Sequence, residues 1–264
     1  MAKSICSNDI VLSKDLDVSK VSYGAPKQLD NGGRSVYISY MSKNLMVQTP
    51  VMNAPFGVNV WPGERGMPDK YTLDLSFAGM ETRPNVREFK DMLSRLGDQV
   101  ITDALENSNL WFKKKYPSRD VIDALFTSNI RYSKDKVTGE VNNMYPPSFK
   151  LTLPYRDNAF TFPVYGSERD PVDLMDIHTS PSRGKGSKVS AIIQCTSIWF
   201  AGSKFGLTWK VCQMRISVPT VLKEYAFLST EEDELAMKEF RAPPIATKDE
   251  EDTYDDGERE KIFV

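Results

Sequence analysis

The sequence predicts a mainly β protein with a helical insertion and an acidic C-terminal tail. Three observations support this fold class. Short segments of alternating apolar and polar residues occur in both halves of the chain, and one long segment between them repeats its apolar residues at helical spacing. Carboxylates crowd the C-terminus. The chain has 264 residues, enough for one well-buried domain or two small ones.

The first predicted strands form the N-terminal part of this pattern. Residues 34–49 (RSVYISYMSKNLMVQT) alternate in character around a polar turn, which predicts a pair of short strands. Proline and glycine limit regular structure in residues 50–66, although this stretch holds Phe56 and Trp61. Residues 71–79 (YTLDLSFAG) have an apolar residue at every second position and therefore predict another strand.

The strongest helix signal follows, at about residues 84–112. Its apolar residues recur at the three- and four-residue spacing of one helix face, and Pro84 suits the first turn. Gly97 marks a point where this helix could be interrupted. A second helix is predicted at roughly 118–130, with Ser118 as its N-cap.

Strand patterning then returns in the C-terminal half. Residues 148–155 and 158–166 predict short strands, and residues 189–200 and 205–217 predict longer strands joined by a turn at residues 201–204. Several short strands with one long helix between the third and fourth favour a five-stranded Greek-key barrel of the oligonucleotide-binding (OB) type over a sandwich. We therefore expect a single OB-fold.

The domain organisation follows from these elements. We predict an N-terminal extension at residues 1–20 and one OB-fold domain at residues 21–230. This domain includes a helical insertion at about residues 84–145, and an acidic, disordered tail occupies residues 231–264.

The sequence also predicts where the protein works. It has no run of 18 apolar residues, and its N-terminus lacks the apolar core of a signal peptide, so we expect neither membrane insertion nor secretion. Cys6, Cys195 and Cys212 are too few and too scattered for a disulfide framework. An intracellular setting is the simplest expectation.

The net charge of −2 hides an asymmetry along the chain. Residues 231–264 contain 13 acidic and 5 basic residues, a charge of −8, whereas the other 230 residues contain 23 acidic and 29 basic residues, a charge of +6. The basic body can attract a polyanion, and the tail can cover the same surface or bind a basic partner. A solvated tail with neither role fits the charge equally well.

Catalytic motifs are missing from the sequence. It contains no HExxH, CxxC or GxSxG, and residues 182–188 (SRGKGSK) lack the leading glycine and the final Ser or Thr of a phosphate-binding loop. The one histidine, His178, lies near Asp173 and Asp176, where a polar loop is favoured over a metal site. We expect a binding protein without enzyme activity, metal or cofactor.

Basic and aromatic residues instead suit the binding of a single-stranded nucleic acid. Basic side chains neutralise phosphates and aromatic rings stack on bases, both without reading the base sequence. Trp209 shares a strand face with Leu207 and Val211, so we expect it in the core. The candidate DNA-binding residues are Arg183, Lys185, Lys188, Trp199, Phe200, Lys204, Phe205, Lys210, Arg215, Tyr37 and Tyr40.

Several segments carry a family resemblance, namely residues 36–58, 70–79, 104–112, 145–155 and 197–216. They resemble the single-stranded DNA-binding proteins of nucleocytoplasmic large DNA viruses, a group similar to the helix-destabilising replication protein of T-seven-type bacteriophages. The resemblance covers about residues 20–218 and the style of the tail. It implies a single OB-fold that coats single-stranded DNA in viral DNA replication, recombination and repair, at replication sites in the host nucleus or in a cytoplasmic factory.

The same resemblance implies two roles for the tail. In that family the tail recruits replication partners, here a viral DNA polymerase or a primase or helicase, and competes with DNA. A second copy of this chain, forming a homodimer, is a further candidate partner. The phage pattern ends on an aromatic residue, whereas here Val264 follows the aromatic. The candidate partner-binding residues of the tail are Asp249, Glu250, Glu251, Asp252, Asp255, Asp256 and Phe263.

Two other functions fit parts of the sequence. A minor virion structural protein, whose β-domain packs against other subunits, would also use exposed aromatics and proline-rich loops, but it does not require the charge of +6 on the body. An RNA-binding barrel would differ only in the sugar it accepts, and nothing in the sequence selects deoxyribose.

Overall fold

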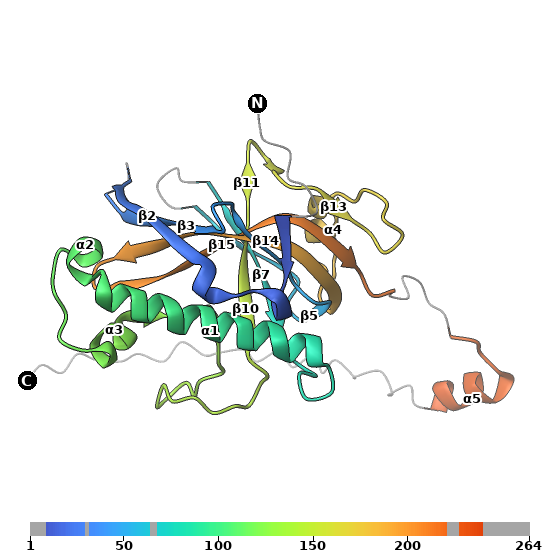
Figure 1. Cartoon of the computed structure of the whole chain (residues 1–264). Coiled ribbons are helices and arrows are strands. Elements are labelled where there is room, and N and C mark those ends of the chain that lie inside the picture. The colour runs from blue at the N-terminus through green and yellow to red at the C-terminus, as the bar shows by residue number, and fades with distance from the viewer. Residues whose placement is uncertain (1–8, 30–31, 64–67, 221–226, 240–264) are drawn as a thin grey trace, which may run out of the picture. The chain divides into compact units, whose positions relative to one another are not determined.

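The computed structural model describes residues 9–29, 32–63, 68–220 and 227–239 (Figure 1). The chain divides into two compact units, residues 1–220 and residues 221–264.

A closed ring of five strands forms the centre of the first unit. Each strand is hydrogen-bonded to the next in the order β14 (Ser187–Ala201), β5 (Met52–Ala54), β7 (Lys70–Ser76), β10 (Ser148–Leu153) and β15 (Lys204–Ser217). The ring closes because β14 and β15 form a long antiparallel hairpin, from the pair Lys188–Ser217 to the pair Ala201–Lys204. The predicted mainly β fold with a five-stranded OB-type barrel is confirmed.

Shorter strands extend the sheet around this barrel. β3 (Arg34–Tyr40) and β4 (Leu45–Gln48) are the two strands predicted at residues 34–49, and each of them pairs with β14. The remaining strands are β1 (Ile10–Leu12) beside β4, β2 (Val21–Gln28) beside β3, β6 (Val58–Trp61) beside β7, β8 (Phe126–Thr127) and β13 (Val164–Tyr165) beside β15, β9 (Ile130–Arg131) beside β10, and the separate pair β11 (Tyr155–Arg156) and β12 (Ala159–Phe160).

Alternation of residue type places the core inside the barrel. Leu73 and Leu75 of β7 and Phe149 and Leu151 of β10 are buried, and intervening polar residues such as Lys150 face outward. A period of two residues therefore gives each of these strands one apolar and one polar face. The outer face of β7 and β10 lines a groove through Lys70, Thr72, Lys150 and Thr152.

The long helical segment covers the barrel and breaks at a different place from the one predicted. It consists of α1 (Pro84–Glu106), which crosses the strands in Figure 1, and α2 (Ser108–Phe112), so the break falls at Asn107. Gly97 is buried inside α1, where an added Cβ would come within 3.3 Å of the Phe126 ring. This glycine allows close packing and does not end the helix.

The second predicted helix is shorter than expected. α3 (Arg119–Leu125) ends before Phe126, which continues into β8 and packs against the ring of Phe205. Ser118 does occupy the N-cap position, but its side chain makes no capping hydrogen bond. Pairing with β15 thus replaces the last turns of the predicted helix.

The stretch around the single histidine is a helix and not the expected loop. In α4 (Leu174–Thr179) the Asp173 side chain caps the N-terminus by accepting a hydrogen bond from the backbone N–H of Met175 at 2.7 Å. The His178 ring packs edge-on against Tyr71, with 5.3 Å between the ring centroids. These contacts give Asp173 and His178 separate structural tasks.

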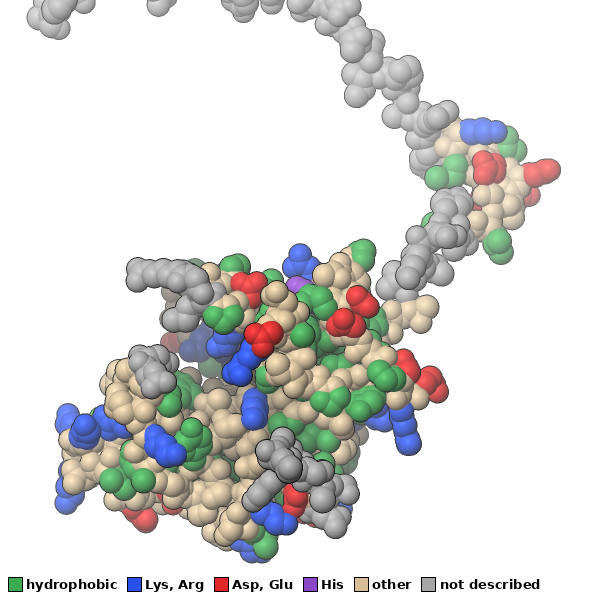
Figure 2. Space-filling model, turned by 90° about the horizontal axis from the view of Figure 1, so that it is seen from above, with side chains coloured by type: hydrophobic (Ala, Val, Ile, Leu, Met, Phe, Trp, Pro, Cys, Tyr) green, Lys and Arg blue, Asp and Glu red, His purple; other side chains and the backbone are tan. Residues whose placement is uncertain are grey.

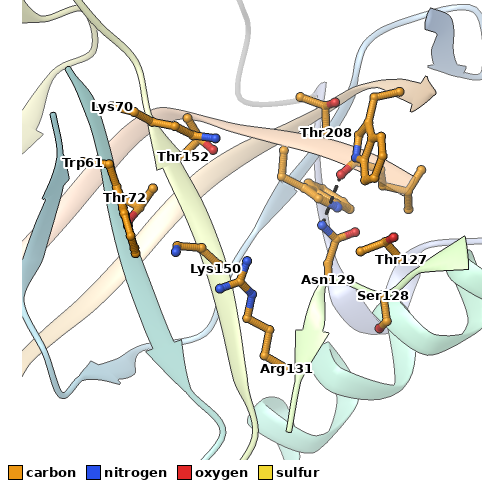
Figure 3. Close-up of a pocket in the computed structure, with 13 residues that line it drawn as sticks. Trp61, Lys70, Thr72, Thr127, Ser128, Asn129, Arg131, Lys150, Thr152 and Thr208 are labelled. Atoms are coloured by element: carbon orange, nitrogen blue, oxygen red, sulfur yellow. Dashed lines mark hydrogen bonds between the residues drawn. The ribbon is translucent and has the colours of Figure 1, made fainter. Parts of the chain in front are cut away.

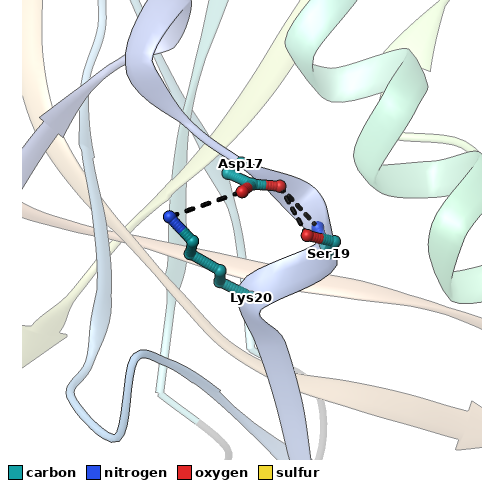
Figure 4. Close-up of polar contacts among 3 residues, drawn as sticks. All are labelled: Asp17, Ser19 and Lys20. Atoms are coloured by element: carbon teal, nitrogen blue, oxygen red, sulfur yellow. Dashed lines mark hydrogen bonds and ion pairs between the residues drawn. The ribbon is translucent and has the colours of Figure 1, made fainter.

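Residues 10–20 belong to the barrel domain, although the sequence predicted an extension there. β1 pairs with β4, and Leu16 is buried in the core between the short 3₁₀ helices η2 (Ser13–Asp15) and η3 (Val18–Lys20). Asp17 caps η3 by accepting hydrogen bonds from the Ser19 hydroxyl and backbone N–H, at 2.7 and 3.1 Å (Figure 4). These two hydrogen bonds lower the pKa of Asp17.

The described part of the second unit contains α5 (Glu231–Glu239), within the tail that the sequence predicts to be disordered. The Thr230 hydroxyl donates to the Asp233 carboxylate at 2.7 Å and accepts from the Asp233 backbone N–H at 3.2 Å, which caps the helix. Acidic residues in its first turn favour this helix through its dipole. The predicted partner-binding residues, from Asp249 to Phe263, lie outside the described residues.

None of the helices in the described ranges is long and apolar enough to span a membrane.

Candidate nucleic-acid interface

A groove of about 570 Å³ lies on the outer face of the barrel, where β6, β7, β10 and β15 run close to the segment 127–131. We call it the tryptophan groove. Figure 3 shows its side chains, with Lys150 and Arg131 ending near each other between Trp61 on one side and Asn129 on the other. The residues that line it are Trp61, Lys70, Thr72, Thr127, Ser128, Asn129, Arg131, Lys150, Thr152, Trp199, Leu207, Thr208 and Trp209.

Three cations give the tryptophan groove a positive wall. Lys70 comes from β7, Arg131 from β9 and Lys150 from β10. Within the described ranges, none of the three forms an ion pair with a carboxylate, and no aspartate or glutamate is among the described residues that line the groove. The groove therefore offers positive charge to an anion from outside.

Among the residues that line the groove, Lys150 has a pKa that is shifted from its ordinary value. Burial lowers the pKa of its ammonium group, and the nearby Arg131 lowers it further. Asp74 acts in the opposite direction and Lys70 in the same direction as Arg131, each with a smaller effect. A bound anion would relieve this repulsion, so the arrangement favours phosphate at this place.

Trp61 forms the outer edge of the groove and is 56% exposed. Its Nε1–H donates to the Thr72 hydroxyl at 3.3 Å, which holds the indole beside β7. The Lys150 ammonium lies 4.9 Å from the centre of the ring, within the range of a cation–π interaction. An exposed, fixed ring beside a cation is suited to stacking on a base whose phosphate contacts that cation.

Trp199 lies on the other side of the groove, opposite Gly206 in the β14–β15 ladder. A Cβ on Gly206 would come within 2.9 Å of the Trp199 ring and of the Thr127 carbonyl. The indole therefore lies directly against the glycine backbone. Nearby, the Asn129 side chain donates to the Leu207 carbonyl at 3.1 Å and ties the segment 127–131 to β15 (Figure 3).

The structure separates the predicted aromatic residues into groove and core. Trp199 lines the groove, whereas Trp209 also borders the groove but is buried in the core as predicted. Phe205 is fully buried among Phe112, Phe126 and Phe200, so the expectation that it contacts DNA is wrong. Its side chain faces inward because it shares the inner strand face with Leu207 and Trp209.

Phe200 is half-buried and belongs to the same aromatic cluster. Its ring contacts Trp111 at 6.4 Å and Phe112 at 5.2 Å between centroids, and it stacks on Phe205 at 6.1 Å. The predicted contact between Phe200 and DNA therefore competes with packing inside the protein.

The predicted basic residues of β15 are all exposed. Lys204 donates to the Ala124 carbonyl at 2.7 Å. Lys210 lies opposite Thr152 in the parallel pair of β10 and β15, next to the tryptophan groove. Arg215 lies further along the strand and lines a second groove.

The predicted basic loop at residues 182–188 folds back onto the turn between β5 and β6. The Arg183 carbonyl accepts from the Val58 backbone N–H at 3.0 Å, and any side chain on Gly57 would collide with that carbonyl. The Lys188 ammonium donates to the Asn53 side chain at 2.5 Å. Arg183 and Lys185 stay exposed, so the loop presents charge from a fixed backbone.

The two predicted tyrosines lie on β3. Tyr37 is 48% exposed and carries the Lys27 ammonium 5.0 Å from its ring centre, whereas Tyr40 is half-buried against the core. Neither lines the tryptophan groove. In the view from above, lysine and arginine side chains are spread over several parts of the domain surface (Figure 2).

Sequence reasoning missed the main cations and the outer ring of the groove, namely Lys70, Arg131, Lys150 and Trp61. A signal for two of them was present, because Lys70 and Lys150 occupy polar positions of strands that alternate clearly. Arg131 lies in the stretch predicted to follow a helix, and Trp61 in a stretch rich in proline and glycine.

Comparisons with known proteins identify relatives and similar structures. A protein-family model described as "Family of unknown function (DUF5871)" matches residues 79–229. "Uncharacterized protein L291" of Acanthamoeba polyphaga mimivirus is 27% identical over 183 residues, which is 66% of this chain and 26% of that protein. The chain thus spans about a quarter of the length of this curated relative.

Two solved structures of bacteriophage proteins are similar at low identity. The single-stranded DNA-binding protein of bacteriophage Enc34, in complex with ssDNA, has a TM-score of 0.42 and 12% identity, covering 76% of this chain and 98% of that one. The single-stranded DNA-binding protein gp2.5 of bacteriophage T7 has a TM-score of 0.40 and 13% identity, covering 70% and 98%.

Proposed function

The chain belongs to the family of unknown function DUF5871, and from the tryptophan groove we propose that it binds single-stranded DNA without sequence preference. The observation that carries the proposal is the exposed Trp61 ring with the Lys150 ammonium at 4.9 Å. Base stacking and phosphate neutralisation, the two contacts that a single strand offers whatever its sequence, are both available at this point.

The chemistry of the groove favours a single strand over a duplex. Trp61 and Trp199 can each stack on a base, while Lys70, Arg131 and Lys150 neutralise the phosphates between the bases. Bases in a duplex already stack on each other, and their faces cannot reach the rings. Duplex recognition would instead require a basic helix for the major groove.

The proposed setting is viral DNA replication, recombination and repair inside the host cell. The sequence resemblance to single-stranded DNA-binding proteins of large DNA viruses supports this setting. A protein that coats exposed single strands needs no sequence preference, which agrees with the stacking and charge available in the groove.

We further propose that the acidic tail competes with DNA and recruits a replication polymerase, primase or helicase. The support is the asymmetric distribution of charge, with a net charge of −8 on residues 231–264 and +6 on the remaining residues. A tethered anionic segment reaches an effective concentration of about millimolar, so it would displace weakly bound nucleic acid and yield to a long single strand. Deletion of residues 246–264 should then tighten DNA binding at low salt and weaken partner recruitment. Unchanged DNA affinity would contradict the competition.

The direct test of DNA binding is a titration of intrinsic tryptophan fluorescence with unstructured oligothymidine at several salt concentrations. Trp61 and Trp199 line the groove, so binding should quench the signal. The logarithm of the binding constant should fall linearly with the logarithm of salt, with a slope of about −0.7 per phosphate contact. A duplex of the same length should respond little, and oligouridine measures the preference for sugar.

A matched pair of variants locates the binding. Lys150→Gln should weaken binding because it removes a cation of the groove, whereas Lys14→Gln removes an exposed cation of η2, outside the groove, and should have little effect. Absence of quenching at low salt, also in the tail-deleted protein, would overturn the proposal and favour a structural protein of the virion.

A further inference from the structure

A second groove, of about 380 Å³, lies on the outer surface beside β13, β14 and β15. We call it the arginine groove. It contains two guanidinium groups, Arg169 and Arg215, together with Tyr165 and the polar side chains of Gln48, Ser190 and Gln213. No aspartate or glutamate is among the described residues that line it. Its composition therefore resembles that of the tryptophan groove, with cations, one aromatic ring and neutral hydrogen-bonding groups.

Neither arginine of this groove has a carboxylate partner in the described part of the chain. Arg169 projects from a tight turn that begins at Gly166, where the Gly166 backbone N–H donates to the Asp170 carbonyl at 2.8 Å. Arg169 itself has a left-handed backbone, with φ of +66°. Glu168 and Asp170 flank it in the turn, but they do not line the groove.

Strand β15 connects the two grooves. Thr208 lines the tryptophan groove, Gln213 and Arg215 line the arginine groove, and the exposed Lys210 lies between them. The distance along the strand from Thr208 to Arg215 is about 20 Å at roughly 3.3 Å per residue, because a β-bulge between them shortens the path. Lys210 has no carboxylate partner among the described residues.

A β-bulge places these side chains on one face. Strict alternation from Thr208 and Lys210 would turn Cys212 and Met214 outward and Arg215 inward. In the ladder with β14, however, Ile192 pairs with Gln213 and Ile193 with Val211, so Cys212 is the extra residue. Met214 and Ile216 are consequently buried, and Arg215 points to the same side as Lys210.

We propose that one continuous single strand of DNA runs along the outer face of β15, from the tryptophan groove across Lys210 into the arginine groove. Arg169 and Arg215 contact phosphates there, and Tyr165 provides a ring for a base. The inference rests on the proposed function and deepens it, because it adds a second contact site and the route that the DNA takes between the two sites. It predicts that the arginine groove matters only for strands long enough to reach it.

The test is a length series of oligothymidines between about 4 and 16 nucleotides, the range that one OB-fold covers. The double variant Arg169→Gln/Arg215→Gln should bind the shortest strands like the unmodified protein and bind the longest ones more weakly. For long strands the magnitude of the salt slope should fall by about 1.4, since each lost phosphate contact removes about 0.7. Arg95→Gln, an exposed arginine of α1, is the matched control and should change neither value.

The outcomes separate this inference from the proposed function. If the double variant binds strands of every length like the unmodified protein, or loses affinity equally at every length, the arginine groove is not a separate contact. Lys150→Gln should instead weaken binding at all lengths. If the unmodified protein binds no oligothymidine at all, the proposed function fails and the path along β15 fails with it.

Discussion

The Lys150 ammonium group lies 4.9 Å from the centre of the Trp61 ring, at the edge of an open groove. The two side chains come from segments almost ninety positions apart, and neither has a structural task in the core. A cation and an exposed ring held together in this way are prepared for a ligand that is both anionic and flat.

Replacing Trp61 tests the stacking contact. Trp61→Ala should lower the affinity for oligothymidine by about 1–3 kcal/mol, or roughly 5- to 150-fold, because one base loses its platform. Trp61→Phe keeps a smaller ring and should lose less. Thermal unfolding should change little for either variant, since the side chain is 56% exposed. Equal affinities of Trp61→Ala and the unmodified protein would exclude this ring from the interface.

The pKa of Lys150 leads to a prediction about proton uptake. Burial and Arg131 lower this pKa in the free protein, so part of the Lys150 population loses its proton as the pH rises into the alkaline range. A bound phosphate stabilises the charged form, and binding at alkaline pH should therefore take up protons and weaken as the pH rises. Calorimetry in two buffers of different ionisation enthalpy measures the uptake. Lys150→Arg keeps its charge and should reduce the uptake; an unchanged uptake would assign it to another group.

Gly206 is predicted to position the Trp199 ring. The methyl group of Gly206→Ala would come within 2.9 Å of that ring, which would have to move, and affinity for DNA should fall. The same methyl group approaches the Thr127 carbonyl, so some stability should be lost as well. The double variant Gly206→Ala/Trp199→Ala separates the two effects on DNA affinity. The losses should be less than additive if Gly206 acts through Trp199, whereas full additivity would refute that role.

A hydrogen bond between β2 and α1 should contribute to stability. The Tyr23 hydroxyl donates to the Asp103 carboxylate at 2.5 Å, and Tyr23→Phe removes this bond and leaves Asp103 with Gln99 as its other side-chain donor. The free energy of unfolding should fall by about 1–3 kcal/mol. Denaturant unfolding measures it, and DNA affinity should be unchanged because Tyr23 lines neither groove.

The pH dependence of stability provides a second measurement of the same contact. Burial, with the Asp103 hydrogen bond and charge, raises the pKa of Tyr23 above its ordinary value of 10.0. A raised pKa means that this stabilisation is complete below pH 10.0 and is lost as the pH rises further. Tyr23→Phe should therefore lose stability less steeply in that range. Parallel curves for the two proteins would show that Tyr23 is not the group responsible.

Local patterns in the sequence predict most of the barrel strands but not the face that every side chain takes. Two β-bulges explain the difference on the central hairpin. Because Cys195 pairs with Trp209 and Ser197 with Thr208, Thr196 is an extra residue, and Trp199 turns to the outer face while Phe200 turns inward. Counting alternate residues from Val189 would have placed Trp199 inside. Such shifts depend on the partner strand and cannot be read from one segment.

The residues of the tryptophan groove could not be predicted from the sequence for a different reason. The Trp61 ring and the three cations lie on β6, β7, β9 and β10, and the pairing of strands that are distant in the sequence, β7 with β10, brings them together. Arg131 reaches the groove because the chain leaves α3 early and pairs with β10, where local propensity favoured more helix. The core position of Trp209, in contrast, was predictable because it depends only on its two neighbours along the same strand face.

The closure of the barrel also determines when this chain can complete its fold. The backbone N–H of Ala191 donates to the Thr49 hydroxyl across 142 positions of sequence, and β5 finds its partner in β14 at a similar separation. Contacts of such long range make folding slow. During synthesis, β5 and β7 leave the ribosome well before β14 does, so the apolar face of α1 has only part of its sheet to pack against. The hairpin of β14 and β15 is local and can form as soon as its turn emerges. The pairing of this hairpin with β5, and of β15 with β10, is then the step that completes the barrel and, with it, the tryptophan groove.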